Sequence, residues 1–137
     1  MRFMIIVRTT RDMEAGRHGP EPLMAEMATY HQQLSKAGVL LDAAALQPSI
    51  KGWRIRYAGD RRTLVDGPFA ETKALVAGFT LIQTKTREEA LEWARRFPNP
   101  APDGGVVEVE VREVVDLDAF AASPSAQKFR ELKGDAQ

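Results

Sequence analysis

Two carboxylates stand at the ends of predicted strands, where a side chain can face a ligand cleft. Asp42 follows the apolar run 39–41, and Asp66 precedes a Gly-Pro pair with Phe69 directly after it. If both carboxylates lined one cavity, their repulsion would raise one pKa and create an acid–base couple. The local alternative is that each aspartate accepts hydrogen bonds from nearby amides, Asp66 from the amide of Phe69 or Ala70 in an Asx turn. We favour this local interpretation and keep the pocket carboxylate as the alternative.

One histidine falls within a predicted helix and is the natural general base. His31 follows Tyr30 and lies four residues after Met27, at the border of an apolar stripe. Its ordinary pKa near 6.5 suits proton transfer at neutral pH, although a histidine at such a border is more often a structural or interface residue. His18 lies in a loop rich in glycine and proline and is expected to be solvated. The spacing of the two histidines matches no zinc motif, so we predict no metal site.

Composition removes several classes of function. The chain has 137 residues, the size of one domain, and contains no cysteine, which excludes disulfides, thiolate nucleophiles and Cys-ligated metals. Nineteen basic and nineteen acidic residues give no net charge, so neither nucleic acid nor an anionic membrane is expected as a partner. There is no glycine-rich phosphate loop or dinucleotide motif, and no cofactor is predicted. The N-terminal apolar run is too short for a signal sequence or a membrane span, so a cytoplasmic location is expected.

A basic stretch interleaved with aromatic residues runs through the first strand of the predicted hairpin. Arg54 and Arg56 alternate with Trp53 and Tyr57, which resembles a surface for single-stranded nucleic acid. Strict alternation in a strand sends the arginines and the aromatic rings to opposite faces. Bases could not stack where the positive charge lies. We therefore interpret this segment as a hairpin with a solvated, charged edge.

The hydrophobic pattern predicts the elements that must position these groups. Alternation and helical spacing predict strands at 2–8, 39–41, 51–57, 63–65, 78–83 and 107–112, and helices at 22–37 and 86–97. Residues 9–20 are expected to be a loop, residues 43–48 a bend or bulge, and a short tail helix follows Ser123. Thr86 and Glu89 form a predicted capping box. The resulting order, β-α-β, hairpin, β-α-β, predicts an α+β fold of the ferredoxin-like split βαβ type with an inserted hairpin.

Two helices cover only one face of such a sheet. The other face must meet water or a partner, most simply a second copy of the chain. Residues 1–115 then form the domain. Residues 116–137 form a tail whose apolar Phe120, Phe129 and Leu132 can serve in dimer contacts.

The octapeptide Asp66-Gly-Pro-Phe-Ala-Glu-Thr-Lys73 resembles the signature of the DGPF branch of the YCII-related proteins. Supporting matches are Ala-Gly-Val-Leu-Leu-Asp at 37–42, Leu-Gln-Pro-Ser at 46–49 and Glu-Trp-Ala at 92–94, and the resemblance covers residues 1–115. It implies a ferredoxin-like domain that dimerises into an α/β barrel, in a family whose members are mostly uncharacterised. Some distant YCII-type proteins are similar to dehydrochlorinating enzymes with a catalytic His and Asp. Met27 and Phe97 occupy the corresponding positions here.

Two functions from different classes follow. The first is a homodimeric protein that binds a small organic molecule in a cleft and acts on it as a lyase or isomerase by acid–base chemistry. The polar groups of that cleft would come from Asp66, Asp42, His31 and Tyr30, with Phe69 as an apolar neighbour. The alternative is a non-catalytic dimeric module that docks on a protein partner such as a transcription regulator. An enclosed cavity with ionisable groups would favour the first, and a filled core the second.

Overall fold

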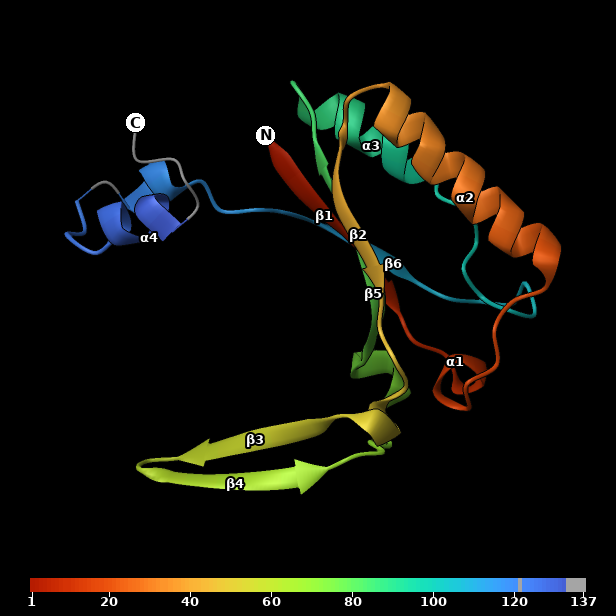
Figure 1. Cartoon of the computed structure of the whole chain (residues 1–137), viewed down its shortest axis with the longest axis horizontal. Helices are drawn as coiled ribbons and strands as arrows, with labels where there is room; N and C mark the ends of the chain where they lie inside the picture. Colours follow the sequence, from red (N-terminus) through yellow and green to blue (C-terminus); the bar gives the residue numbers. More distant parts are fainter. Residues whose placement is uncertain (121, 133–137) are drawn as a thin grey trace.

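The computed structural model describes residues 1–120 and 122–132, and its centre is a four-stranded antiparallel sheet (Figure 1). The strands are β1 (Arg2–Arg8), β2 (Leu40–Ala45), β5 (Val76–Gln83) and β6 (Val109–Glu113), in the order β2-β5-β1-β6. This is the split βαβ order, and the α+β prediction is confirmed. The hairpin β3 (Trp53–Ala58) and β4 (Arg61–Asp66) forms a separate two-stranded sheet, inserted between β2 and β5.

The two long helices pack on one face of the sheet. They are α2 (Glu21–Lys36) and α3 (Arg87–Arg95). In β1, buried residues alternate with half-buried ones, because every second side chain faces the helices. The core cluster between the helices and the sheet consists of Phe3, Ile5, Tyr30, Leu34, Val39, Ile82 and Ala90. Burial of these side chains against the helices holds the sheet and both helices together.

The ends of both helices follow from local sequence. Pro22 lies in the first turn of α2, and Gly38 follows that helix with φ +72°, a conformation that favours glycine. At α3, the Thr86 hydroxyl accepts a hydrogen bond from the Glu89 amide at 3.1 Å, as predicted. The returning bond differs from the prediction, because Glu89 accepts from the Lys85 amide instead of the Thr86 amide.

Two segments differ from the sequence prediction. The expected loop 9–20 contains a short helix, α1 (Arg11–Glu14), which begins where the Thr10 hydroxyl accepts a hydrogen bond from the Met13 amide at 3.2 Å. Strand β2 does not end at Asp42 but continues to Ala45 with a bulge at Leu41. The continuation is possible because three small alanines pair with residues 78–80 of β5.

Two arms leave the sheet at opposite ends and extend on the side away from the helices (Figure 1). The hairpin arm comprises residues 51–66. The tail arm, residues 114–120 and 122–132, carries a 3₁₀ turn (Leu117–Phe120) and the short helix α4 (Ala126–Leu132). Among residues 1–120 and 122–132, no helix lies on the face of the sheet between the arms, and the strands form an open sheet and not a closed barrel. Within the described residues, no helix combines the length and apolar character needed to cross a membrane.

Candidate active site in a cavity between helix α2 and the sheet

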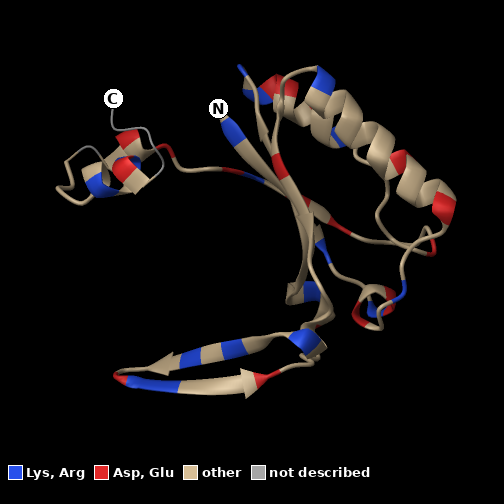
Figure 2. Cartoon of the chain, in the orientation of Figure 1, with Lys and Arg blue, Asp and Glu red and all other residues tan. Residues whose placement is uncertain are grey.

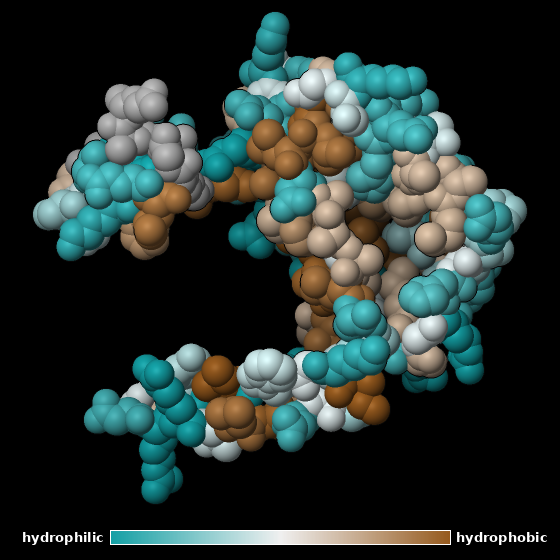
Figure 3. All heavy atoms as spheres, viewed as in Figure 1, coloured by the Kyte–Doolittle hydropathy of each residue, from teal (hydrophilic) through white to brown (hydrophobic). Residues whose placement is uncertain are grey.

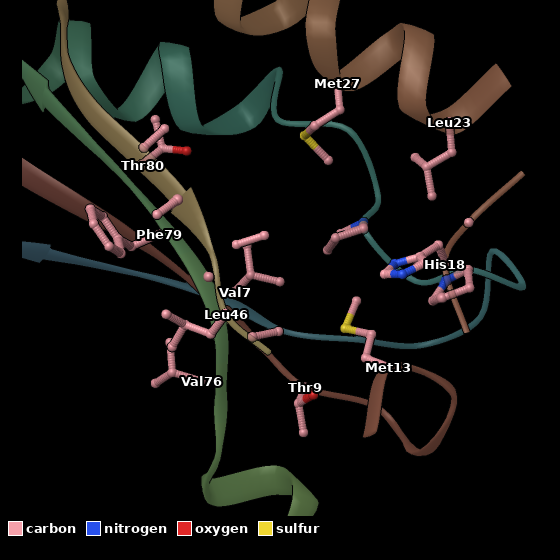
Figure 4. Close-up of a pocket in the computed structure, with 18 of the residues that line it drawn as sticks. Val7, Thr9, Met13, His18, Leu23, Met27, Leu46, Val76, Phe79 and Thr80 are labelled. Atoms are coloured by element: carbon pink, nitrogen blue, oxygen red, sulfur yellow. The ribbon is translucent and has the colours of Figure 1, made fainter. Parts of the chain in front are cut away.

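A cavity of about 530 Å³ lies between α2 and the sheet (Figure 4). Strands β2 and β5 and the end of β1 form its floor, and α1, the loop at 18–19 and the segment at 97–102 close its sides. Met24 and His18 line the cavity and are exposed, which marks its mouth. Most of the lining is apolar, including Leu23, Met27 and Phe97.

The cavity exists because one half of the apolar stripe of α2 has no large partner. Tyr30 and Leu34, in the C-terminal half, are buried in the core. Leu23 and Met27, in the N-terminal half, are only half-buried and line the cavity. Opposite them, residues 43–45 of β2 are all alanine and leave room. Methionine and leucine side chains on a wall of this kind can adjust to the shape of a ligand.

His31 supplies a polar group to this wall and is held by two hydrogen bonds. Its Nδ1 lies 2.8 Å from the Met27 carbonyl oxygen, and its Nε2 lies 2.8 Å from the Thr80 Oγ1. A carbonyl oxygen only accepts, so Nδ1 carries the hydrogen and the neutral ring accepts the Thr80 hydroxyl hydrogen at Nε2. The ring also meets those of Tyr30 and Phe97 edge to face, with centroids 5.5 and 6.2 Å away. The imidazole is therefore fixed in orientation, with its basic nitrogen beside a buried hydroxyl.

A second polar group stands near the cavity mouth, where three segments meet at Ser49. The Glu14 carboxylate, which lines the cavity, accepts hydrogen bonds from the Ser49 amide at 2.9 Å and from the Ser49 hydroxyl. The Ser49 Oγ in turn accepts from the Phe69 amide at 3.0 Å. These bonds tie α1 to the turn at 66–69 that follows the hairpin. They position one side of the cavity mouth.

The turn at 66–69 is closely packed, which explains its glycine. A Cβ on Gly67 would lie 1.8 Å from the Ser49 carbonyl oxygen, so no side chain fits there. The Gly67 amide donates to the Gly52 carbonyl at 3.0 Å, and the Gly67-Pro68 peptide is cis. The motif thus closes the base of the hairpin arm against the segment 48–52.

Comparison with known proteins shows the family to which this chain belongs. Residues 1–115 match the family described as YCII-related domain. The chain belongs to that family. An uncharacterised protein of Rhizobium meliloti (strain 1021) is 35% identical over 89 residues, covering 65% of this chain and 72% of that protein. A solved structure similar to the YCII-related chain is a 5-chloro-2-hydroxyhydroquinone dehydrochlorinase from Burkholderia phenoliruptrix AC1100, in complex with 2,5-dihydroxybenzoquinone. It is 14% identical, covers 84% of this chain and 94% of that one, and has a TM-score of 0.45.

Of the five candidates from the sequence, His31 alone lines the cavity of this YCII-related chain. Asp42 and Asp66 do not converge, because Asp42 pairs opposite Leu81 in the main sheet and Asp66 pairs opposite Trp53 in the hairpin. Both are exposed, and the Asp42 carboxylate accepts the amide hydrogen of the next residue at 2.8 Å. The Phe69 amide donates to the Ser49 hydroxyl and not to Asp66, which rules out the Asx turn through Phe69.

Tyr30 and Phe69 make contacts that stabilise the fold outside the cavity. The Tyr30 hydroxyl donates to the Trp93 carbonyl at 2.7 Å and joins α2 to α3, and burial raises its pKa to about 12. The guanidinium of Arg54 lies 3.9 Å from the centre of the Phe69 ring, a cation–π contact at the base of the hairpin arm. Neither side chain lines the cavity.

Sequence reasoning missed Thr80 and Glu14. Thr80 is 2% exposed between the apolar residues of β5, and a polar residue at an inward-facing strand position is the signal that could have identified it. Glu14 lay in the segment expected to be a loop and carried no distinguishing pattern. Met27 and Phe97, the positions that the resemblance assigned to a catalytic pair, both line the cavity as apolar groups.

Proposed function

We propose that the protein binds a small, mainly apolar organic molecule between α2 and the sheet, and that His31 acts on this molecule as an acid–base group. The observation that carries the proposal is the fixed pair of His31 and Thr80 on an otherwise largely apolar cavity wall. Ligand pockets typically combine an apolar lining with a few polar groups that orient the ligand. A filled core would have favoured the docking alternative, and the open space supports small-molecule binding instead.

The cavity also limits the class of ligand. Its volume of about 530 Å³ suits a small organic molecule of the size that protein pockets commonly hold. The Glu14 carboxylate already accepts two hydrogen bonds from Ser49. The Thr80 hydroxyl donates to His31 and its oxygen can still accept, so this pair is best placed to bind a ligand oxygen through Thr80. We infer a ring or chain with a hydroxyl or carbonyl oxygen.

The chemistry follows from the hydrogen bonds of His31. The Thr80 hydroxyl can pass its hydrogen to the neutral Nε2 while its oxygen takes a proton from a carbon next to a ligand carbonyl, and the electron pair of the broken C–H bond delocalises onto the carbonyl oxygen. The protonated Nε2–H then donates to the Thr80 oxygen, whose own hydrogen becomes available to a ligand oxygen. Return of the proton to another carbon gives an isomerisation, and departure of a group from the neighbouring carbon gives an elimination.

A thermal-shift screen with small phenols, ketones and carboxylic acids tests the proposal. A ligand at a hundred times its dissociation constant stabilises the native state by about 2.7 kcal/mol, which a melting curve resolves. Hits should be lost in Ala43→Leu, which fills the cavity, and weakened in His31→Phe and Thr80→Val, which remove the polar pair. Asp66→Asn is the matched control, because Asp66 is exposed and outside the cavity. Hits that bind Ala43→Leu as tightly as the wild type would refute the cavity as the binding site.

We further infer that a second copy covers the open face, so that two four-stranded sheets face each other as an α/β barrel. The support is the apolar strip of Met4, Ile6, Phe79 and Leu81, which pair with one another across β1 and β5 on this face. Figure 3 shows hydrophobic residues gathered where the sheet faces the gap between the arms. Beside the strip, Glu110 bonds to Arg8 at 2.6 Å and to Arg112 at 3.2 Å, and these bonds lower the pKa of Glu110. Sedimentation equilibrium should show a dimer that Ile6→Arg converts to a monomer.

A further inference from the structure

The hairpin arm exposes an apolar face. Every residue of β3 is exposed, and the exposed fractions of Trp53, Tyr57 and Leu64 are 62%, 62% and 66%. Trp53, Ile55, Tyr57 and Leu64 share one face, because Ile55 pairs with Leu64 and strand residues alternate. A two-stranded hairpin with no further packing is marginally stable in water. This face therefore needs a partner surface.

The tail arm has the same property. Val115 is 56% exposed, Phe120 51%, Phe129 56% and Leu132 83%. Helix α4 is seven residues long and shorter than helices that are stable alone, so its apolar side chains also call for a partner.

The two arms carry opposite net charge (Figure 2). Residues 51–66 contain five basic and two acidic residues, a net charge of +3, and residues 114–132 contain three acidic and two basic residues, a net charge of −1. Among the residues that the structure describes, Arg62 of the hairpin arm forms no ion pair, and it lies on the apolar face because it pairs with Tyr57. Complementary potentials of this kind select one mode of association over others.

The arms cannot meet within one chain. They leave the sheet at opposite ends, and the seven residues of β1 that separate these ends span about 20 Å. Both arms extend on the side of the open face, where the proposed second copy would lie. A two-fold axis through that space can place each hairpin arm on the partner's tail arm. The other two-fold arrangement would place hairpin on hairpin, and the +3 charges would repel.

We propose that each hairpin arm docks on the tail arm of a second copy of this chain, in two equivalent contacts about a two-fold axis. The inference rests on the proposed pairing of the open faces and adds which surfaces meet beyond the sheets. Apolar side chains of each arm cover those of the other, and the opposite charges set the pairing. Residues 116–132 thereby become part of the dimer interface.

Charge reversal on each arm tests the pairing, with sedimentation equilibrium at about 0.1 M salt as the measurement. Arg62 lies opposite Tyr57 on the apolar face of the hairpin arm, and Arg62→Glu should weaken the dimer by about tenfold or more, because both contacts become repulsive. Glu131→Lys should do the same from the tail arm. The chain with both substitutions should recover the wild-type association. The matched control is Arg87→Glu with Arg95→Glu. Both arginines are exposed on α3, and their reversal should not change the dimer association.

Each outcome decides between the two proposals. If both reversals leave the dimer unchanged while Ile6→Arg separates it, the open faces pair and the docking of the arms is refuted. If the hairpin reversal weakens the dimer and the variant with both reversals does not recover, the hairpin meets another surface and the docking is again refuted. If the wild-type chain is a monomer, the paired open faces and the docked arms are both refuted.

Discussion

The Nε2 of His31 and the Oγ1 of Thr80 lie 2.8 Å apart, and the opposite ring nitrogen of His31 donates to the Met27 carbonyl. The same helix that supplies the histidine therefore also fixes which of its nitrogens carries the lone pair that can accept a proton. Thr80 comes from the central part of β5, so the pair also joins α2 to the sheet.

The first prediction concerns this tautomer. When the His31 ring is neutral, its ¹⁵N spectrum should show the hydrogen on Nδ1. Thr80→Val should keep that tautomer, because the Met27 carbonyl sets it, and should lower the free energy of unfolding by about 1 kcal/mol through loss of one hydrogen bond. Urea denaturation measures the second effect. A hydrogen on Nε2 in the neutral wild-type protein would contradict the assignment.

The second prediction concerns two glycines beside Ser49. Gly67→Ala places a Cβ 1.8 Å from the Ser49 carbonyl oxygen, so the turn must shift, and we expect the free energy of unfolding to fall by about 3 kcal/mol. Gly52→Ala is the matched control. Its Cβ would lie 3.6 Å from the same oxygen, and its φ of −116° suits any residue. Equal melting temperatures for the two variants would show that the turn at 66–69 accommodates the Cβ without a loss of stability.

The sequence predicted the elements better than the cavity, and the reason is physical. The alternation in β1 and the stripe of α2 record which side of each element is buried, because burial selects residue type at each position. Whether Leu23 and Met27 meet a filled core or an open space depends on the small residues 43–45 of another strand. That is a tertiary relationship, and the pattern of α2 alone does not contain it.

The acidic candidates failed for a related reason. Asp42 was placed at a strand end because the alanines after it show no alternation, yet alanine fits a strand with either face and β2 continues. Asp66 does end a strand, but that strand belongs to an arm that extends away from the cavity. His31 was correctly placed at the border of the stripe, since its position on α2 alone decided that.

The third prediction concerns the pH dependence of stability. Burial holds the pKa of Tyr30 at about 12, against about 10 in an unfolded chain. Between these values the unfolded chain loses the phenolic proton and the folded chain keeps it, so the contribution of Tyr30 is complete below pH of about 10 and is lost as the pH rises toward 12. Two pKa units correspond to a loss of about 2.7 kcal/mol.

Comparison with Tyr30→Phe isolates this effect from the other groups that titrate at alkaline pH. The variant lacks the hydrogen bond to the Trp93 carbonyl, so it should be less stable than the wild type at neutral pH. Its free energy of unfolding should then fall less steeply between pH of about 10 and 12, and the two curves should approach each other. Urea denaturation of both proteins across this range measures the difference. Parallel curves would mean that Tyr30 ionises as readily in the folded protein as in the unfolded chain.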